Sequence, residues 1–455
     1  MRIIIVGDGK VGSILTSQLA KEGHEVVVID KRSGVLKNAE NREDVLTIVG
    51  NGADLNVLKE AGAGESDLII AVTNADEVNI LCCLVAKKLG CKHTIARVRN
   101  PEYSSQLVFM REELGLSMSI NPELAAAREI KRLVAYPSAL KVESFLRGRI
   151  ELIEIKLTEG NPLIGTPLSQ IHAKYKAKVL VCAIKRNGEI LIPKGDVVLQ
   201  EKDKITITGS MSDMTAFFRK IGIMQNRIRN VMIVGGGKIS YYLADRLLES
   251  GSEVTIIEQN HDRCLELCDI LPKAHVIHGD GADSELLLEE GMAEMDAVIS
   301  LTGMDEENVM ISLYATRSGV KKVIAKVDRM PHLEILEEIG VDTVISPKNI
   351  TSTQIVHFVR SMVSQENSTL QSLYRIADDE VEALEFVIPT NAKGYYLHKA
   401  IKFLSFKDNM LLAAIFRNSE VILPRGDDTI EPGDHVIVVT THTGLSNLED
   451  IFAEV

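Results

Sequence analysis

The feature that most constrains the fold is a glycine-rich turn between two apolar segments at the start of the chain. Residues 2–6 are an apolar run that leads into Gly7-Asp-Gly-Lys-Val-Gly12. An amphipathic stretch follows at 13–22, and a second apolar run at 26–29 ends on Asp30. This order predicts a strand, a tight turn, a helix and a second strand, which is how a doubly wound α/β domain begins.

Each glycine of the turn has a physical role. Gly7 permits the sharp turn out of the strand, Gly9 leaves room for a pyrophosphate, and Gly12 lets the helix pack close to the strand. The free N–H groups and the positive end of the helix then face the diphosphate. Asp30 lies 18 residues beyond Gly12, where its carboxylate can accept hydrogen bonds from ribose hydroxyls. We therefore predict a nucleotide site of the Rossmann type, with a turn that serves packing alone as the alternative.

The same pattern returns 228 residues later. Gly235-Gly-Gly237 follows the apolar run 231–234, and Ser240 stands at the position of the third glycine. A second run, 254–257, ends on Glu258. A repeat at one fixed offset of this length indicates duplication of a whole domain pair rather than a solenoid.

The pattern between the two turns predicts the domain organisation. Strand and helix signals alternate through 1–123 and 228–348, which is typical of a parallel sheet covered on both faces. Residues 140–224 and 368–453 instead predict small α+β domains; in the first of these, Arg186-Asn-Gly188 is a hairpin turn. The predicted fold class is α/β: two doubly wound parallel-sheet Rossmann domains, each followed by a small α+β domain, in a tandem duplication.

Further candidate binding residues follow the strands of the first Rossmann domain, since ligands of doubly wound sheets sit beyond the carboxyl ends of the strands. Thr73 and Asn74 come after the predicted strand 68–72. Arg97 and Arg99 are assigned to the predicted strand 94–98, where two residues two apart point to the same face. Phosphate capture is the favoured role for this pair, and a solvated strand end or an inter-subunit salt bridge is the alternative. For the polar stretch 76–79, helix capping and a role in the site stay equally open.

Composition excludes some classes of function. The net charge of −13 and the absence of Trp argue against a nucleic-acid partner, which needs a basic footprint and base-stacking aromatics. Met1 leads straight into the first strand, and no apolar run approaches the ~18–20 residues that span a bilayer. We therefore expect a cytoplasmic protein, with docking on a membrane protein left open. Cys264 and Cys268 lack further ligands nearby in sequence, so no metal site is predicted.

In combination, the motifs Gly7–Gly12 with Asp30, Gly50–Asp54 and Thr73–Asn79 resemble the Trk-type potassium-uptake regulator family, whose chains carry two RCK (KTN) modules. The resemblance covers essentially the whole sequence. It implies RCK-N domains at 1–123 and 228–348 and RCK-C domains at 140–224 and 368–453. It further implies a dimer or ring at the inner face of the plasma membrane, on a K⁺-translocating subunit of the Trk/Ktr type. NAD(H), or ATP and ADP, would bind the Rossmann domains and gate transport.

The resemblance also assigns nucleotide contacts residue by residue. In the first module they are Gly7, Asp8, Gly9, Lys10, Val11, Gly12, Asp30, Gly52, Thr73, Asn74, Arg97 and Arg99. In the second module they are Gly235, Gly236, Gly237, Lys238, Ile239, Glu258, Asp280, Thr302 and Lys326. Lys326 replaces Arg97, and Asp328 stands where Arg99 does, so we expect the second site to favour a less charged nucleotide or to bind more weakly.

An NAD-dependent oxidoreductase with tandem Rossmann domains is the alternative function. Such an enzyme needs a proton-transfer residue against a substrate pocket, usually in a substantial second domain. The small domains here show no evident acid/base constellation. We therefore predict a regulatory subunit without catalytic residues.

Overall fold

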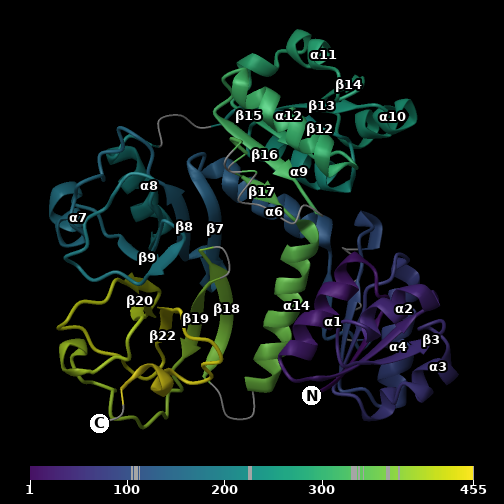
Figure 1. Cartoon of the computed structure of the whole chain (residues 1–455), viewed down its shortest axis with the longest axis horizontal. Helices are drawn as coiled ribbons and strands as arrows, with labels where there is room; N and C mark the ends of the chain where they lie inside the picture. The colour runs from purple at the N-terminus through teal and green to yellow at the C-terminus, as the bar shows by residue number, and fades with distance from the viewer. Residues whose placement is uncertain are drawn as a thin grey trace. The chain divides into compact units, whose positions relative to one another are not determined.

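The computed structural model describes the chain except for residues 104–105, 107–110, 112, 224–227, 329–335, 337–338, 342, 365–368, 378–379 and 454–455. Contacts within the chain divide it into two compact units. The first unit contains Met1–Ile130, Val231–Ser318 and Ile324–Phe358, and the second contains Lys131–Asn230, Gly319–Val323 and Val359–Val455. Figure 1 shows the elements of both, coloured along the chain.

The first Rossmann module is built on a six-stranded sheet, counted over the described residues, with the order β3-β2-β1-β4-β5-β6. All of its strand pairs run parallel. Its strands are β1 (Arg2–Val6), β2 (Glu25–Asp30), β3 (Leu46–Val49), β4 (Leu68–Ala71), β5 (His93–Arg97) and β6 (Met118–Ile120). Its helices are α1 (Lys10–Lys21), α2 (Ser33–Glu40), α3 (Leu55–Glu60), α4 (Asp76–Leu89) and the short 3-10 turn η1 (Ala63–Glu65).

The predicted α/β class is confirmed by this strand order, which is that of a Rossmann domain. Strands β1 to β3 are added toward one edge of the sheet, and β4 to β6 are added toward the other edge, so the order of addition changes between β1 and β4. Residues 3–6 of β1 and all of β4 are buried, as expected for central strands covered on both faces. One face of the sheet packs against α4 through Cys82, Cys83 and Ala86, and burial raises the pKa of all the thiols in this cluster. These cysteines therefore serve as small core residues.

The second Rossmann module repeats the arrangement, with the order β14-β13-β12-β15-β16-β17 among the described residues. Its strands are β12 (Asn230–Val234), β13 (Glu253–Glu258), β14 (His275–His278), β15 (Ala297–Ser300), β16 (Lys322–Lys326) and β17 (Val344–Ile345). Its helical elements are α9 (Lys238–Glu249), α10 (His261–Ile270), α11 (Ser284–Glu289), η3 (Met292–Glu294) and α12 (Asp305–Arg317). The tandem duplication is therefore present in the fold as well as in the sequence.

A long helix follows each Rossmann module. These helices are α6 (Pro122–Ala135) and α14 (Pro347–Ser364). Proline begins each of them. Its fixed φ suits the first turn, and it loses nothing by lacking an N–H, because the N–H groups of a first turn have no acceptor inside the helix. In the sequence, Asn121-Pro122 predicts the start of a long helix that reaches about Ala135, and the bounds of α6 confirm it. The sequence also predicts a helix between Arg99 and residue 117, and this segment lies partly outside the described residues.

The small modules are antiparallel sheets of five strands each, with the equivalent orders β10-β9-β11-β8-β7 and β18-β19-β22-β20-β21 over the described residues. The first contains β7 (Ala139–Phe145), η2 (Leu146–Gly148), β8 (Ile150–Lys156), α7 (Leu168–Tyr175), β9 (Leu180–Arg186), β10 (Glu189–Leu191), β11 (Lys204–Ser210) and α8 (Met211–Lys220). The second contains β18 (Leu370–Ile376), β19 (Val381–Val387), η4 (Ile401–Phe403), β20 (Met410–Arg417), β21 (Glu420–Ile422), β22 (His435–Thr440) and η5 (Leu448–Ile451).

The hairpin predicted in the first small module is confirmed, because β9 and β10 pair antiparallel around Asn187 and Gly188, which both have positive φ. Strand β7 was not expected from the sequence. Its register shifts between Ala139 and Lys141, and this irregularity removes the strict alternation by which a half-buried strand is recognised.

The two small modules share one apolar core inside the second unit. Phe145, Leu152 and Cys182 of the first module pack in the same buried cluster as Ala383 and Ile437 of the second. Polar contacts join the modules as well: the Lys141 amine donates to the Arg375 carbonyl at 2.7 Å. The duplicated modules therefore associate as an intramolecular pair.

Candidate nucleotide-binding sites

The first glycine-rich turn has the geometry that each glycine was expected to supply. Gly7 has φ +96°, and a Cβ there would lie 3.0 Å from the Thr73 backbone. A Cβ on Gly12 would come within 1.9 Å of the Gly7 carbonyl oxygen, which confirms the close packing of α1. Gly9, the residue that caps α1, has no heavy atom within 4 Å of its added Cβ. Open space therefore lies in front of the helix, where a pyrophosphate was predicted.

Of the three glycine positions of the turn, only the third is changed in the second module. Gly235 has φ +102°, and Gly237 again faces open space. Ser240 is fully buried in α9, and its hydroxyl donates to the Gly235 carbonyl. A glycine would let the helix backbone pack directly on the turn. Ser240 instead joins the helix to the turn through this hydrogen bond, and the turn is preserved.

The acidic residues that end the second strand of each module, Asp30 and Glu258, make the same two backbone contacts. Asp30 accepts from the Asp8 N–H and the Arg32 N–H, both at 2.9 Å. Glu258 accepts from the Gly236 N–H at 2.6 Å and the Asn260 N–H at 2.7 Å. Each carboxylate is therefore fixed beside its glycine-rich turn, the location expected of a ribose acceptor.

The longer Glu258 side chain is accommodated by the residue at the middle of its turn. A Cβ on Gly236 would lie 2.6 Å from the Leu267 side chain and 2.9 Å from the Glu258 carboxylate, whereas the first module has the side chain of Asp8 at this position, next to the shorter Asp30. Asp8 is 5% exposed and accepts from the Thr16 hydroxyl at 3.3 Å. A side chain at position 236 would therefore have to displace Glu258 or Leu267, which favours glycine there.

Asp8 and Asp30 have opposite pKa shifts although they are neighbours. Burial, reinforced by the charge of Asp30, raises the pKa of Asp8. Burial alone would raise the pKa of Asp30 too, but hydrogen bonds from Arg32 and from the Asp8 N–H outweigh it and lower that pKa. Ionisation at this turn is therefore more favourable for Asp30 than for Asp8.

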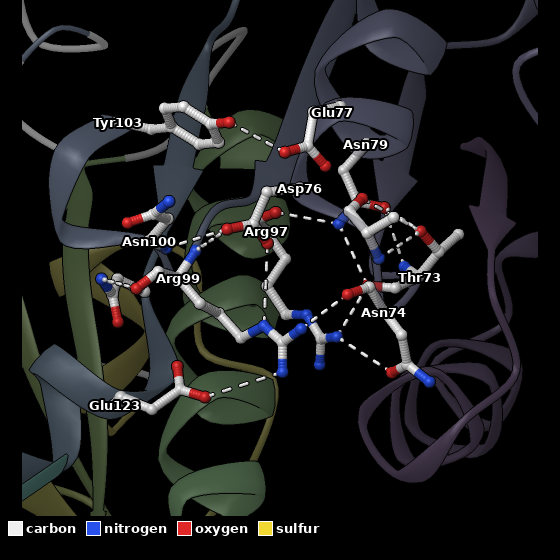
Figure 2. A network of polar contacts seen from close by, with 12 residues as sticks. Thr73, Asn74, Asp76, Glu77, Asn79, Arg97, Arg99, Asn100, Tyr103 and Glu123 are labelled. Atoms are coloured by element: carbon white, nitrogen blue, oxygen red, sulfur yellow. Dashed lines mark hydrogen bonds and ion pairs between the residues drawn. The ribbon is translucent and has the colours of Figure 1, made fainter. Parts of the chain in front are cut away.

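Asn79 organises the strand ends of the first module (Figure 2). Its side chain is fully buried; the amide oxygen accepts from the Thr73 N–H at 2.8 Å, and the amide nitrogen donates to the Arg97 carbonyl at 2.8 Å. Asn308 repeats both contacts with Thr302 and Lys326 in the second module, at 2.8 and 2.9 Å. Asn79 thus holds the ends of β4 and β5 together.

Asp76, the first residue of α4, makes its contacts outside the helix. Its carboxylate accepts from the N–H groups of Arg99 and Asn100, both at 2.8 Å, and Asp305 accepts from the Asp328 N–H at 2.9 Å. The structure thus assigns residues 76 and 79 to the framework of the site.

The prediction that Arg99 lies on a strand is wrong, because β5 ends at Arg97 and Asp76 turns the backbone of Arg99 out of the sheet. The guanidinium groups nevertheless lie beside each other (Figure 2). Arg97 donates to the Thr73 carbonyl and Arg99 to the Asn74 carbonyl, both at 2.6 Å. Burial, together with the charge of Arg99, lowers the pKa of Arg97.

Glu123, at the start of α6, is a residue of this region that sequence reasoning missed. Its carboxylate lies 3.9 Å from the Arg99 guanidinium, and burial raises its pKa. One carboxylate oxygen of Glu123 and the Nε atoms of Arg97 and Arg99 are buried without a hydrogen-bond partner. An acidic residue directly after Asn121-Pro122 was the available signal, but only the fold brings it to the arginines.

The second module carries different charges on the same backbone. Lys326 donates to the Thr302 carbonyl at 2.5 Å, as Arg97 does to Thr73, and burial lowers its pKa. Asp328 occupies the position of Arg99 and lies 3.6 Å from the amine of Lys10. At the strand ends, one cation of the first module is therefore replaced by an anion in the second.

The remaining predicted contacts fall into two groups. Gly52 packs against β1, since a Cβ there would lie 2.0 Å from Val6, and Asp280 accepts from the Ala282 N–H at 2.9 Å. The rest begin the two helices behind the turns, Lys10 and Val11 in α1 and Lys238 and Ile239 in α9. The structure thus brings the turn, the acidic residue and the strand ends of each module to one edge of its sheet, while nucleotide contact by these residues stays a prediction.

Fold and site together define a class of proteins with tandem Rossmann and small α+β modules. The TrkA-N domain model matches residues 3–122 and 231–347, and the TrkA-C domain model matches 152–222 and 383–453. The chain is 34% identical over 452 residues to the Trk system potassium uptake protein TrkA homolog of Archaeoglobus fulgidus, covering 99% of this chain and 100% of that one. It is 33% identical to TrkA of Halomonas elongata, covering 99% and 98%. The chain belongs to the TrkA family.

Solved structures agree on the fold. The GsuK RCK domain superimposes with a TM-score of 0.64 at 17% identity, covering 96% of this chain and 92% of that chain. The GsuK channel bound to NAD gives a TM-score of 0.64 at 17% identity, covering 96% and 76%. No helix within the described residues is both long and apolar enough to cross a membrane.

Proposed function

We propose that this chain is a nucleotide-binding regulatory subunit of a Trk-type potassium uptake system. In this proposal NAD(H), or ATP and ADP, bind the Rossmann modules, and the chain gates a membrane K⁺ translocator without catalysing a reaction. The observation that carries it is the open space at Gly9 beside the ionised Asp30, in a chain of the TrkA family. Potassium enters the proposal because the relatives are named as potassium uptake proteins. The nucleotides enter it because GsuK, which shares the fold, has been solved bound to NAD and to ADP.

The proposed contacts are the turn 7–12 with Asp30, Gly52, Thr73, Asn74, Arg97 and Arg99, and the turn 235–239 with Glu258, Asp280, Thr302 and Lys326. The proposed domains are 1–123, 140–224, 228–348 and 368–453. A nucleotide that binds one arrangement of the modules better than another shifts their populations, and this shift is the gating signal. We further propose that the chain associates with itself and acts at the inner face of the plasma membrane.

What favours regulation over an oxidoreductase is the use of the small modules. Their inner faces are filled by a shared apolar core, so those faces are not available to line a substrate pocket. Sustained NADH oxidation with a small-molecule substrate would reverse this preference.

Gly9→Val tests the first site because it adds bulk only where the ligand belongs. Gly9 has φ −78°, which any residue adopts, and nothing contacts its added Cβ, so the fold should be unchanged. We expect nucleotide affinity at this site to fall by at least about a hundredfold. Gly237→Val tests the second site, and Gly34→Val, also in open space, is the control. Equal binding by Gly9→Val and the control would show that the site is misassigned.

The partner is tested by capture of the tagged full chain from gently solubilised membranes. We expect a polytopic membrane protein to be retained, and its retention to differ among ATP, ADP and NADH. If the chain is recovered alone under every nucleotide, the regulatory proposal fails even where nucleotide binding itself is confirmed.

A further inference from the structure

A second candidate ligand site lies in the unit formed by the small modules. It is a cavity of about 940 Å³ between the first small module and the β20–β21 turn of the second. Its walls are the segment before β8, the segment before β9, helix α8 and residues 419–421. The cavity is wide open to solvent, and its volume is at the upper end of the roughly 300–1,000 Å³ typical of small-molecule pockets.

Positive charge predominates in the lining. Arg149, Lys178 and Arg219 reach the cavity from three separate segments. The guanidinium of Arg149 lies over the ring of Phe416, 5.1 Å from its centroid, and this contact limits its freedom. Of the two lining carboxylates, Asp213 already accepts the Ser210 hydroxyl at 2.6 Å, which leaves Glu420 for a ligand.

Helix α8 also directs donors into the cavity. Ser210 caps it by accepting from the Asp213 N–H at 3.1 Å, so the N–H groups of Met211 and Ser212 at its first turn have no partner inside the helix. Both residues line the cavity, as does Thr215 one turn later. N–H groups at a helix start combined with guanidinium and ammonium groups favour a phosphate.

The duplication did not preserve this wall in the second small module. The sequence Ser210-Met-Ser-Asp213 begins α8, whereas the equivalent Thr441-His-Thr-Gly444 ends on a glycine with φ +81°. Residues 441–447, all within the described part of the chain, form no helix. The wall that helix α8 contributes to the cavity is therefore present in the first module alone.

We propose that this cavity binds a phosphorylated sugar or a comparable small organic phosphate. The phosphate is held by Arg149, Lys178, Arg219 and the start of α8, and Glu420 accepts a hydrogen bond from a ligand hydroxyl. The site is separate from both glycine-rich turns and does not depend on the function proposed for them.

Hydrogen-exchange mass spectrometry of the full chain with ribose 5-phosphate tests the site and its position. We expect slower amide exchange in peptides covering 209–217 and 418–422. Arg219→Gln should weaken this effect by about three- to fivefold, and the double variant with Arg149→Gln by about tenfold or more. Lys194→Gln, an exposed cation of the same module outside the cavity, is the control and should match the wild type. Arg219 is exposed, so its replacement leaves the fold intact even if the double variant is unstable.

Two results would overturn the proposal. One is the absence of protection in these peptides, including protection found only at the glycine-rich turns. The other is equal protection in the wild type and the Arg219→Gln variant. The role of Glu420 is tested with Glu420→Gln and a second ligand, inorganic pyrophosphate, which lacks a hydroxyl-bearing sugar. We expect affinity for ribose 5-phosphate to fall and that for pyrophosphate to rise, each by about twofold; a rise for both would show that Glu420 accepts no hydroxyl.

Discussion

The two Rossmann modules have the same backbone contacts at their strand ends but different charges on them. Asn79 and Asn308 make equivalent hydrogen bonds, as do Asp76 and Asp305. At one equivalent position, however, the first module has Arg99 and the second has Asp328. The comparison separates two kinds of residue: buried polar groups that hold the loops in shape, and flanking charges, for which we predict a role in ligand preference.

The comparison also shows how a substitution can be absorbed by its neighbour. Glu258 keeps the contacts of Asp30 beside Gly236, which has no side chain, and Ser240 occupies the position of Gly12 with its hydroxyl bonded to the turn. Differences between the copies at such positions do not imply a lost site.

The largest expected effect is on stability and comes from Gly12→Ala. The new Cβ would lie 1.9 Å from the Gly7 carbonyl oxygen, so α1 must shift, at a cost of about 3 kcal/mol. Differential scanning calorimetry of the full chain should show a lower melting temperature for this variant. Gly34→Ala, in open space within α2, is the matched control and should melt like the wild type or slightly higher. Equal melting of both variants would mean that the helix is not held close to the turn.

Asn79→Ala should cost about 2 kcal/mol, because it leaves the Thr73 N–H and the Arg97 carbonyl unpaired in a buried site. Hydrogen exchange should increase in peptides covering residues 71–76, and Asn308→Ala should do the same at 300–305. Asn56→Ala, on the exposed surface of α3, provides the control. No change at 71–76 would contradict the organising role of Asn79.

Exchanging the flanking charges tests whether they set ligand preference. Arg99→Gln should lower ATP affinity at the first site by about three- to tenfold through the loss of a charge-assisted contact, with a smaller loss for NADH. Asp328→Asn should raise ATP affinity at the second site, so that the two sites become more alike. Calorimetric titrations in the Gly237→Val and Gly9→Val backgrounds isolate the first and second sites respectively. Unchanged ATP affinity in both variants would show that these charges do not determine nucleotide preference. Lys59→Gln on α3 is the control for the change in net charge.

The smallest effect is a pH-dependent gain from Asp8→Asn. Because burial raises the pKa of Asp8, the folded protein carries a cost for ionising it at neutral pH, and the cost disappears as pH falls through the raised pKa. The variant should therefore melt higher than the wild type at pH 7, and the difference should vanish in acid. Asp30 has a lowered pKa, so its ionised form stabilises the folded protein at pH values above the pKa of the unfolded chain. This stabilisation is lost as pH falls through the pKa of the folded protein. Asp30→Asn should therefore destabilise the protein at pH 7. A gain that persists unchanged in acid would show that ionisation of Asp8 is not its cause.

The sequence alone determined the parts of the protein that depend on local spacing. The glycine-rich turns, the strands and helices around them, the acidic residues that end the second strands and the duplication could be predicted because steric requirements act over a few residues. The hairpin at Asn187 and Gly188 was predictable for the same reason, since its turn needs positive φ.

Tertiary structure decided what depends on residues far apart in the chain. Several features of the protein arise from contacts between distant segments. They are the approach of Glu123 to Arg99, the contacts of position 8 with 30 and of 236 with 258, the turn of Arg99 out of the sheet by Asp76, and the core shared by the small modules. A sequence pattern reports the periodicity of each segment but not which segments meet. The burial of a side chain and the charges around it depend on those contacts. They give Asp8 and Asp30 opposite pKa shifts although both are aspartates beside the same turn.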